Sequence, residues 1–149
     1  MTQPAKFTIG VFAILFDSEG NVLLCHRRDV DLWNLPGGGV ELGETPWDGV
    51  VREVEEESGL RVAVDRLAGI YGKPEVDEIV FSFVCRVIGG ALAPSDEADR
   101  LEYFALDRIP PNTSRKQVER IRDAADEKGG VALKEQRGPS SMQSGGTVG

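Results

Sequence analysis

The sequence predicts an α/β domain in which a mixed β-sheet is packed between helices. Strand-like runs rich in Val, Ile, Leu and Phe stand on both sides of one amphipathic helix, which we expect at residues 45–59. A second helix, preceded by Ser114, follows the last of these runs. The chain has 149 residues, a length that suits one domain with a sizeable core. We place this domain at residues 1–128.

The first two strands are expected at residues 7–16 and 21–27, joined by a tight turn that contains Gly20 and Asn21. The first run is apolar and follows Lys6, so a signal peptide is an alternative. It lacks a small-residue cleavage site, however, and its ten residues are too few to span a bilayer. We therefore interpret it as a core strand.

The helix at residues 45–59 has clear signals at both ends. Thr45 is a favourable N-cap, Pro46 suits the first helical position, and Gly59 is a natural stop. Between them, an apolar stripe at helical spacing predicts a buried face that consists of Trp47, Val50, Val51 and Val54. Gly49 costs this helix about 1 kcal/mol relative to alanine, so we expect tight packing at that position.

The remaining elements follow from the same signals. We expect strands at residues 61–71 and 79–88, and a short strand at 103–105 after a loop at 89–100. Ser114 then caps a final helix that runs to about residue 128. From there on, Gly, Ser and Gln are frequent and apolar residues are few, which predicts a disordered tail at residues 129–149.

Charge and cysteine content exclude several classes of function. The net charge is −8, and such a surface repels nucleic-acid backbones and anionic membranes, so we expect neither as a partner. Residues 38–60 contain seven acidic side chains and a single basic one, Arg52. Cys25 and Cys85 are isolated within apolar runs, so we expect reduced core residues and a cytoplasmic protein.

The acidic helix is the strongest candidate for a functional site. Glu53, Glu56 and Glu57 stand at i, i+3 and i+4, so they share one helix face. A solvated acidic surface is the simpler interpretation. Carboxylates held ~4 Å apart, however, repel by roughly 4 kcal/mol at an effective dielectric constant of 20, and a cation would remove that cost. Oxygen-only ligands favour Mg²⁺, with Mn²⁺ as the alternative, over zinc.

Three glycines before this helix are compatible with a phosphate site. Gly37, Gly38 and Gly39 let the backbone turn sharply and approach a ligand closely. The helix start that follows has free N–H groups and a positive dipole end. Three glycines alone more often mark a simple turn. Combined with carboxylates at a fixed distance along the chain, they are a more specific signal of a phosphate site.

Residues 38–60 read G-x5-E-x7-R-E-V-x-E-E-x-G-L, which resembles the Nudix box at every defining position. The preceding Leu35, Pro36 and Gly37 match the usual lead-in to that box, and a looser resemblance extends over residues 6–128. The resemblance implies a Nudix-type α/β/α sandwich with a mixed central β-sheet. It also implies Mg²⁺-dependent hydrolysis of a diphosphate linkage in a nucleoside diphosphate derivative.

The resemblance also assigns roles to residues of the box. Glu53, Glu56, Glu57 and the Gly38 carbonyl are implied as metal ligands. Arg52 is implied to orient the glutamates by ion pairing, and Glu44 to brace the loop. Glu53 or Glu56 is the implied general base, although some family members recruit a glutamate from a distant loop.

Outside the box, a few residues are candidates for contact with the substrate. Arg27 ends the second strand, where related proteins often carry a basic residue, so it joins Gly37 and Gly38 as a candidate phosphate contact. Glu97 precedes the last strand, where some relatives supply an extra metal ligand or base; Glu75 and Glu78 are its rivals. Arg28 is expected to point to solvent, and the single histidine, His26, to have a structural role.

The sequence alone leaves several functions open. ADP-ribose or a nucleotide sugar is the preferred substrate class, because no extra module is evident. A (d)NTP pyrophosphohydrolase that cleans the nucleotide pool is the alternative, and a non-catalytic nucleotide sensor is a third. Sensors usually lose box glutamates, whereas this box is complete, which favours the enzyme. Many relatives are dimers, so a homodimer is an open alternative, but the sequence identifies no interface.

Overall fold

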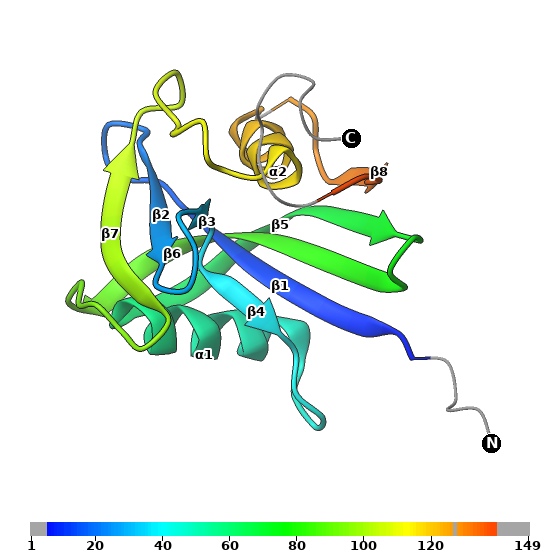
Figure 1. Cartoon of the computed structure of the whole chain (residues 1–149), viewed down its shortest axis with the longest axis horizontal. Coiled ribbons are helices and arrows are strands. Elements are labelled where there is room, and N and C mark those ends of the chain that lie inside the picture. Colours follow the sequence, from blue (N-terminus) through cyan, green and yellow to red (C-terminus); the bar gives the residue numbers. More distant parts are fainter. Residues whose placement is uncertain (1–5, 127, 140–149) are drawn as a thin grey trace.

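The computed structural model describes residues 6–126 and 128–139. It contains a five-stranded sheet of order β4-β1-β6-β5-β8, a three-stranded sheet of order β3-β2-β7, and two helices (Figure 1). The elements are β1 (Thr8–Leu15), β2 (Val22–Arg27), β3 (Trp33–Asn34), β4 (Gly37–Gly39), α1 (Pro46–Ser58), β5 (Leu60–Lys73), β6 (Glu78–Gly90), β7 (Ala98–Phe104), α2 (Arg115–Ala125) and β8 (Ala132–Glu135).

The larger sheet is mixed. β1 pairs in parallel with β6 and antiparallel with β4. β5 pairs antiparallel with β6, and β8 adds to its other edge in parallel. The predicted mixed sheet is therefore confirmed.

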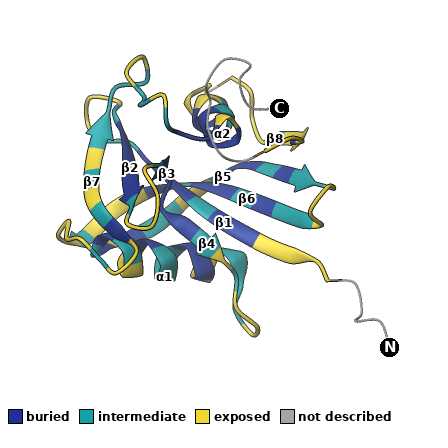
Figure 2. Cartoon of the chain, viewed as in Figure 1, coloured by how far each residue is buried: buried dark blue, intermediate teal, exposed yellow. Residues whose placement is uncertain are grey.

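One helix lies on each side of this sheet (Figure 1). Val50 and Val54 of α1 are fully buried in a core shared with β1, β5 and β6. Ile121 of α2 is buried in a second core, with Trp33 and Leu35. Figure 2 shows the buried residues of both helices turned toward the strands. The fold is thus the α/β/α sandwich that the sequence predicts.

The ends of α1 are also as predicted. Thr45 is the N-cap, and its side chain accepts a hydrogen bond of 3.1 Å from the Asp48 N–H. Gly59 ends the helix with φ of 79°, a left-handed conformation that favours glycine. Gly49 is explained by crowding, since a Cβ atom there would lie 2.9 Å from Glu44 Oε1.

Two predictions about the second half of the chain are wrong. β7 begins at Ala98 rather than at residue 103. The polar sequence before residue 103 is typical of a loop, but backbone pairing with β2 makes it a strand. β8 lies inside the segment expected to be disordered, and Gln136 just after it is buried, donating from Nε2 to the Lys116 carbonyl at 2.9 Å. The expected disorder is thus contradicted for residues 129–139, and residues 140–149 lie outside the described part of the chain.

Smaller differences concern the second helix and the cysteines. α2 ends at Ala125, and the Ser114 side chain makes no capping hydrogen bond although it stands at the N-cap. Cys25 and Cys85 are free and buried, as predicted. Burial raises the pKa of both thiols, that of Cys85 to about 12, so neither is a thiolate nucleophile at neutral pH. Within the described residues, neither helix is long and apolar enough to cross a membrane.

His26 links β2 to β7 and to the loop after β2. Its ring nitrogens lie 2.7 Å from Asp99 Oδ1 and 2.7 Å from Asp31 Oδ1, and its ring packs edge-on against Trp33. Hydrogen bonding to Asp31 and Asp99 raises the pKa of His26 above its usual value of 6.5. The expected structural role thus has a physical basis, because the protonated ring joins two acidic segments.

We expect His26→Gln to lower the free energy of unfolding more at pH 6 than at pH 8.5. A raised pKa means that the folded protein binds the His26 proton more tightly than the unfolded chain does. This stabilisation is complete below the unfolded pKa and is lost as the pH rises through the folded pKa. Urea denaturation at both pH values measures the difference, expected at about 0.5–1 kcal/mol for such a partly exposed ion pair. An equal loss at both pH values would contradict the assignment.

Candidate active site

Three carboxylates from two separate segments meet beside α1. Glu53 and Glu57 lie one turn apart on α1, and Glu97 comes from the segment just before β7. One carboxylate oxygen of each lies within 4.8 Å of the other two. Among residues 6–126 and 128–139, this is the one group of His, Cys, Asp and Glu side chains placed closely enough to hold a metal ion. We call it the carboxylate group.

β4 runs so close to α1 that a side chain on its middle residue would displace the Glu53 carboxylate. A Cβ atom at Gly38 would lie 2.6 Å from the Glu53 carboxylate, well inside van der Waals contact. Next to it, the Gly37 N–H donates a long hydrogen bond of 3.4 Å to Glu57 Oε2. β4, which we call the glycine strand, therefore lies directly against the carboxylate group. Glycines allow a backbone to approach a ligand this closely.

Burial makes the carboxylates costly to ionise together. It raises the pKa of Glu57 to about 8, and the nearby charges of Glu97 and Glu53 act in the same direction. Burial also raises the pKa of Glu53, against the opposing effect of Arg52. A divalent cation would reverse these shifts, because it favours the ionised form of each ligand. The donor set consists of oxygen alone, which fits a hard cation such as Mg²⁺ or Mn²⁺.

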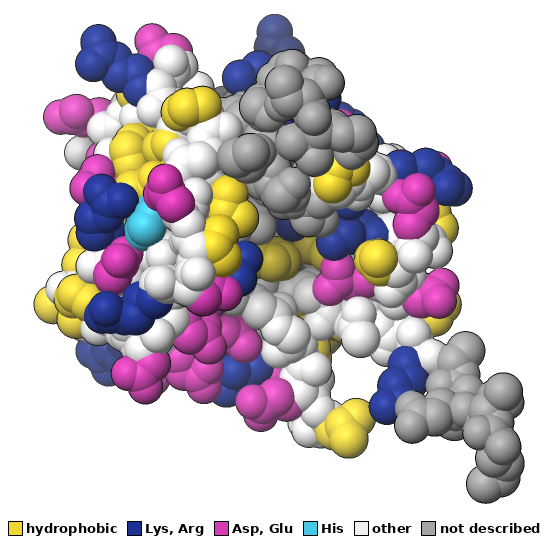
Figure 3. All heavy atoms as spheres, viewed as in Figure 1, with side chains coloured by type: hydrophobic (Ala, Val, Ile, Leu, Met, Phe, Trp, Pro, Cys, Tyr) yellow, Lys and Arg dark blue, Asp and Glu magenta, His cyan; other side chains and the backbone are white. Residues whose placement is uncertain are grey.

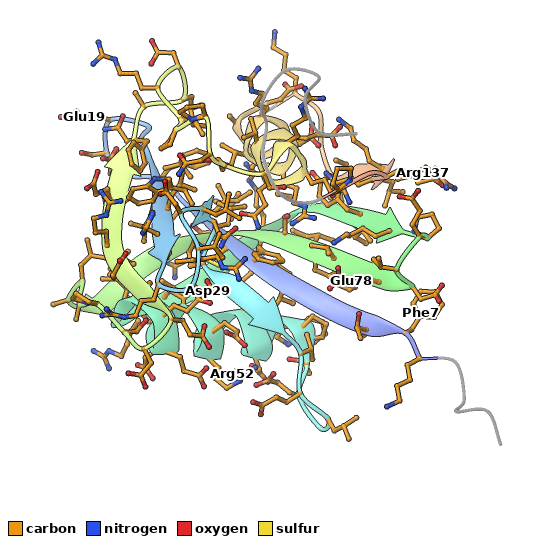
Figure 4. All side chains as sticks on the ribbon, in the orientation of Figure 1. Phe7, Glu19, Asp29, Arg52, Glu78 and Arg137 are labelled. Atoms are coloured by element: carbon orange, nitrogen blue, oxygen red, sulfur yellow. The ribbon has the colours of Figure 1, made fainter. Side chains whose placement is uncertain are left out.

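Arg52 joins α1 to the loop that precedes it. Its Nε and Nη2 donate to both oxygens of Glu44 at 2.7 and 2.9 Å, and Nη2 also donates to the Gly39 carbonyl at 3.0 Å. Nη1 donates to Glu53 Oε1 at 3.1 Å. Hydrogen bonding to Arg52 lowers the pKa of Glu44 to about 2. Arg52 thus connects Glu53 to Glu44 and to the glycine strand, and it lies on the outer side of α1 in Figure 4. The orienting and bracing roles of Arg52 and Glu44 stay predictions.

Glu56 lies outside the carboxylate group. Its side chain is 56% exposed, and Oε2 lies 3.1 Å from Arg52 Nη1. The structure therefore brings Glu97, and not Glu56, together with Glu53 and Glu57. The reason is local, since Arg52 is the single cation of residues 38–60 and Glu56 stands one helical turn away. A metal-binding role of Glu56 stays a prediction.

A cavity of about 640 Å³ opens beside the carboxylate group. Glu57, Glu97 and Gly37 line it, and Arg27 and Arg28 line it from the end of β2. Arg27 Nε donates to Asp29 Oδ1 at 2.8 Å, so an acidic neighbour already holds this candidate phosphate contact. Arg28, expected to point to solvent, lines the cavity as well. Figure 3 shows acidic and basic side chains side by side on this face.

The opposite wall of the cavity contains residues that the sequence reasoning missed. They come from β5 and α2: Lys73, Ser114, Lys116, Gln117 and Arg120. Charged side chains on a short helix are typical of a solvent-facing surface, which is why they drew no attention. One signal in the sequence could have identified them. Gln117 and Arg120 flank the apolar stripe of Val118 and Ile121, so they lie near the buried face of the helix.

The two rivals of Glu97 lie away from the carboxylate group. Glu78 lines this opposite wall, where it is paired with Lys73 at 2.8 Å, and Figure 4 shows it well apart from Arg52. Glu75 accepts a hydrogen bond of 2.7 Å from the Gly138 N–H. Of the three loop glutamates, only Glu97 meets the carboxylates of α1.

Comparisons with known proteins agree with this geometry. The family model described as the NUDIX domain matches residues 6–124. A MutT-like protein of Streptomyces ambofaciens is 34% identical over 84% of this chain and 81% of its own length. A Bacillus subtilis protein, provisionally named 8-oxo-dGTP diphosphatase, is 35% identical over 73% of this chain and 76% of its own. The solved ADP-ribose pyrophosphatase of Streptococcus suis is 27% identical and has a TM-score of 0.72, covering 87% of this chain and 99% of that one.

The matched region includes every element of the site. Residues 6–124 contain the glycine strand, α1, Glu97 and nearly all of α2. The sequence motif, the sandwich fold and the carboxylate group lie in one continuous domain. The chain therefore belongs to the Nudix family and is a Nudix hydrolase, a pyrophosphohydrolase that acts on phosphorus-containing anhydrides.

Proposed function

We propose that this chain hydrolyses the diphosphate linkage of a nucleoside diphosphate derivative, of the ADP-ribose or nucleotide-sugar type, with Mg²⁺ as the cofactor. The observation that carries the proposal is the carboxylate group in the wall of a cavity of about 640 Å³. Such a cavity has the size of a site for a small organic ligand.

Glu53, Glu57 and Glu97 would hold the cation. Their oxygens are close enough to share one ion, and the pKa of Glu57, about 8, marks a site that a cation would stabilise. A bound Mg²⁺ supplies charge neutralisation at the phosphoryl oxygens and a lower pKa for an attacking water. Mn²⁺ offers the same preference for oxygen ligands.

The other residues of the site hold this geometry. Arg52 fixes Glu53 through Nη1 while it is itself anchored to Glu44. Gly37 donates its N–H to Glu57, and the absence of a Cβ at Gly38 leaves the Glu53 carboxylate in its place. Arg27 lines the cavity and would reach a phosphate after exchanging its contact with Asp29. Glu56 is exposed beside Arg52 and is available as a further ligand or base.

The cavity also bears on the substrate class. It continues from the carboxylate group to α2, so the substrate has room for a second group beyond the diphosphate. The likeness to the Streptococcus suis ADP-ribose pyrophosphatase, over 99% of that chain, supports such a substrate. A (d)NTP pyrophosphohydrolase is the second candidate, because the Bacillus subtilis relative is named for 8-oxo-dGTP.

We expect the purified protein to cleave ADP-ribose or a nucleotide sugar with Mg²⁺, and Glu57→Gln to lower kcat by about 100-fold or more. The amide cannot supply the charge that the cation requires, and loss of such electrostatic stabilisation has effects of that order. A panel of ADP-ribose, nucleotide sugars, dinucleotides and nucleoside triphosphates, with product analysis, measures both.

Glu55→Gln is the matched control for that variant. It removes one charge from the same helix, but Glu55 is exposed and belongs to neither the carboxylate group nor the cavity wall. We expect it to retain wild-type kcat. A preference for nucleoside triphosphates would select the second candidate, and Glu57→Gln activity equal to wild type would contradict the assigned metal site.

For Glu97→Gln, we expect the Mg²⁺ concentration at half-maximal rate to rise by about tenfold or more, with much of the rate restored at saturating Mg²⁺. Loss of one of several carboxylate ligands weakens metal affinity more than it changes the chemistry. A Mg²⁺ titration of the initial rate tests this, with the exposed Glu102→Gln of β7 as control. If instead kcat falls while the Mg²⁺ requirement is unchanged, Glu97 acts as the base.

A further inference from the structure

We propose that the α2 wall of the cavity is a second subsite, which binds an anionic group of the substrate remote from the reacting diphosphate. We define this wall by Lys73, Ser114, Lys116, Gln117 and Arg120. A phosphate or a carboxylate has the required chemistry. The inference rests on the proposed function in one respect, namely that this cavity receives the substrate.

Ser114 has a hydroxyl group without a hydrogen-bond partner among the described residues. Three buried side-chain hydroxyls lack a hydrogen-bond partner within the described residues, those of Ser82, Thr113 and Ser114. Of these, only Ser114 lines the cavity, and it is 3% exposed. It also stands at the N-cap of α2 without making the capping bond usual for serine there. A buried hydroxyl left unpaired is costly, so a ligand atom is its natural partner.

Arg120 is a buried cation that is held by neutral groups alone. It is 2% exposed, and its Nε and Nη2 donate only to the amide oxygen of Gln136, at 3.1 and 2.9 Å. Within residues 6–126 and 128–139 it makes no ion pair, and its Nη1 donates to no protein atom. Burial lowers the pKa of Arg120 to about 10, although the charges of Glu78 and Glu119 act in the opposite direction. A buried guanidinium without a directly paired anion is unfavourable, and a bound anion would compensate it.

The geometry around Arg120 favours an anion over a stacked nucleobase. The rings of Phe12 and Tyr71 lie 5.2 and 5.5 Å from its guanidinium carbon. Because two aromatic rings already lie against the guanidinium, we expect a ligand to use hydrogen bonds from its N–H groups. Oxygen atoms of a phosphate or carboxylate suit such donors best.

The charge of the α2 wall agrees with this assignment. Lys73, Lys116 and Arg120 line it, against one carboxylate, that of Glu78, which is paired with Lys73. Burial lowers the pKa of Lys116, and the charges of Lys73 and Arg120 lower it further against the opposing charges of Glu75 and Glu78. The positive end of the α2 dipole adds to the same field. The cavity thus has an acidic end at the carboxylate group and a basic end at α2.

The two ends are joined by a short series of contacts. Gly37 donates to Glu57 and packs against Phe12, whose ring lies beneath Arg120. In addition, the Leu35 N–H donates to Gln117 Oε1 of α2 at 2.6 Å. Because the hydrogen bond between Leu35 and Gln117 is short and buried, it holds α2 against the segment that leads into the glycine strand and the carboxylate group. One substrate can therefore reach both ends.

Binding of inorganic phosphate to the metal-free protein, measured by titration calorimetry, tests the subsite without requiring turnover. We expect Ser114→Ala to weaken phosphate binding about fivefold and Arg120→Gln tenfold or more, as for loss of a neutral and of a charged hydrogen bond. Arg122→Gln, on the exposed side of the same helix, should bind as the wild type does. The Ser114→Ala protein should unfold at or above the wild-type temperature, because its hydroxyl has no partner in the free protein.

A second measurement identifies the source of the anion. If the subsite takes a substrate group, phosphate raises the apparent KM of Mg²⁺-dependent hydrolysis, and it does so less in Ser114→Ala. If phosphate changes kcat alone, the anion is a separate effector and the proposal is wrong. The proposal would also be overturned if the wild type did not bind phosphate, or if Ser114→Ala and Arg120→Gln bound phosphate as tightly as the wild type does. Because calorimetry needs neither metal nor substrate, these outcomes are independent of whether the proposed hydrolysis occurs.

Discussion

The close contact between β4 and α1 is the constraint on which the site depends. β4 pairs with β1 at Val11↔Gly38, while α1 buries Val50 and Val54 against the same sheet. A Cβ at Gly37 would lie 2.2 Å from the Val11 carbonyl oxygen of β1, and one at Gly38 would displace the Glu53 carboxylate of α1. The consecutive glycines thus set the distance at which the helix carboxylates face the backbone, and with it the position of the metal site.

Charge compensation then divides the acidic residues into two sets. Arg52 lies within 3.1 Å of oxygens of Glu44, Glu53 and Glu56, and 3.5 Å from Glu41. One guanidinium therefore serves four carboxylates on the outer side of α1. It does not reach Glu57, whose pKa rises to about 8 through burial and the charges of Glu97 and Glu53. The uncompensated charge is concentrated on the inner side of the helix, which is where a cation is needed.

Features that depend on neighbouring residues alone could be predicted from the sequence, and features that depend on tertiary contacts could not. Thr45, Pro46 and Gly59 act through their own turn of backbone, so the bounds of α1 could be predicted. The spacing of Glu53 and Glu57 is equally local. Glu97, by contrast, reaches the site through pairing of β7 with β2, more than seventy residues apart in the chain. Its segment looked like any exposed loop, and only tertiary structure distinguishes it from Glu75 and Glu78. The same limit explains why β8 was taken for a disordered tail, since its order comes from β5 and α2 and not from its own composition.

The segment after β8 also supports residues that line the cavity. Gln136 follows β8 and holds two donors of Arg120, while its own Nε2 donates to the Lys116 carbonyl and to Glu119. The Lys116 ammonium donates in turn to the Gly138 carbonyl. The segment after β8 thus positions two cations of the α2 wall without adding a charge of its own to either contact. Because a neutral amide satisfies the geometry of Arg120 but not its charge, the segment orients the guanidinium while leaving its positive charge available to a ligand. The box of residues 38–60 contributes Glu53 and Glu57 to the acidic end of the cavity, and a segment with no recognisable motif holds two cations of the basic end in place.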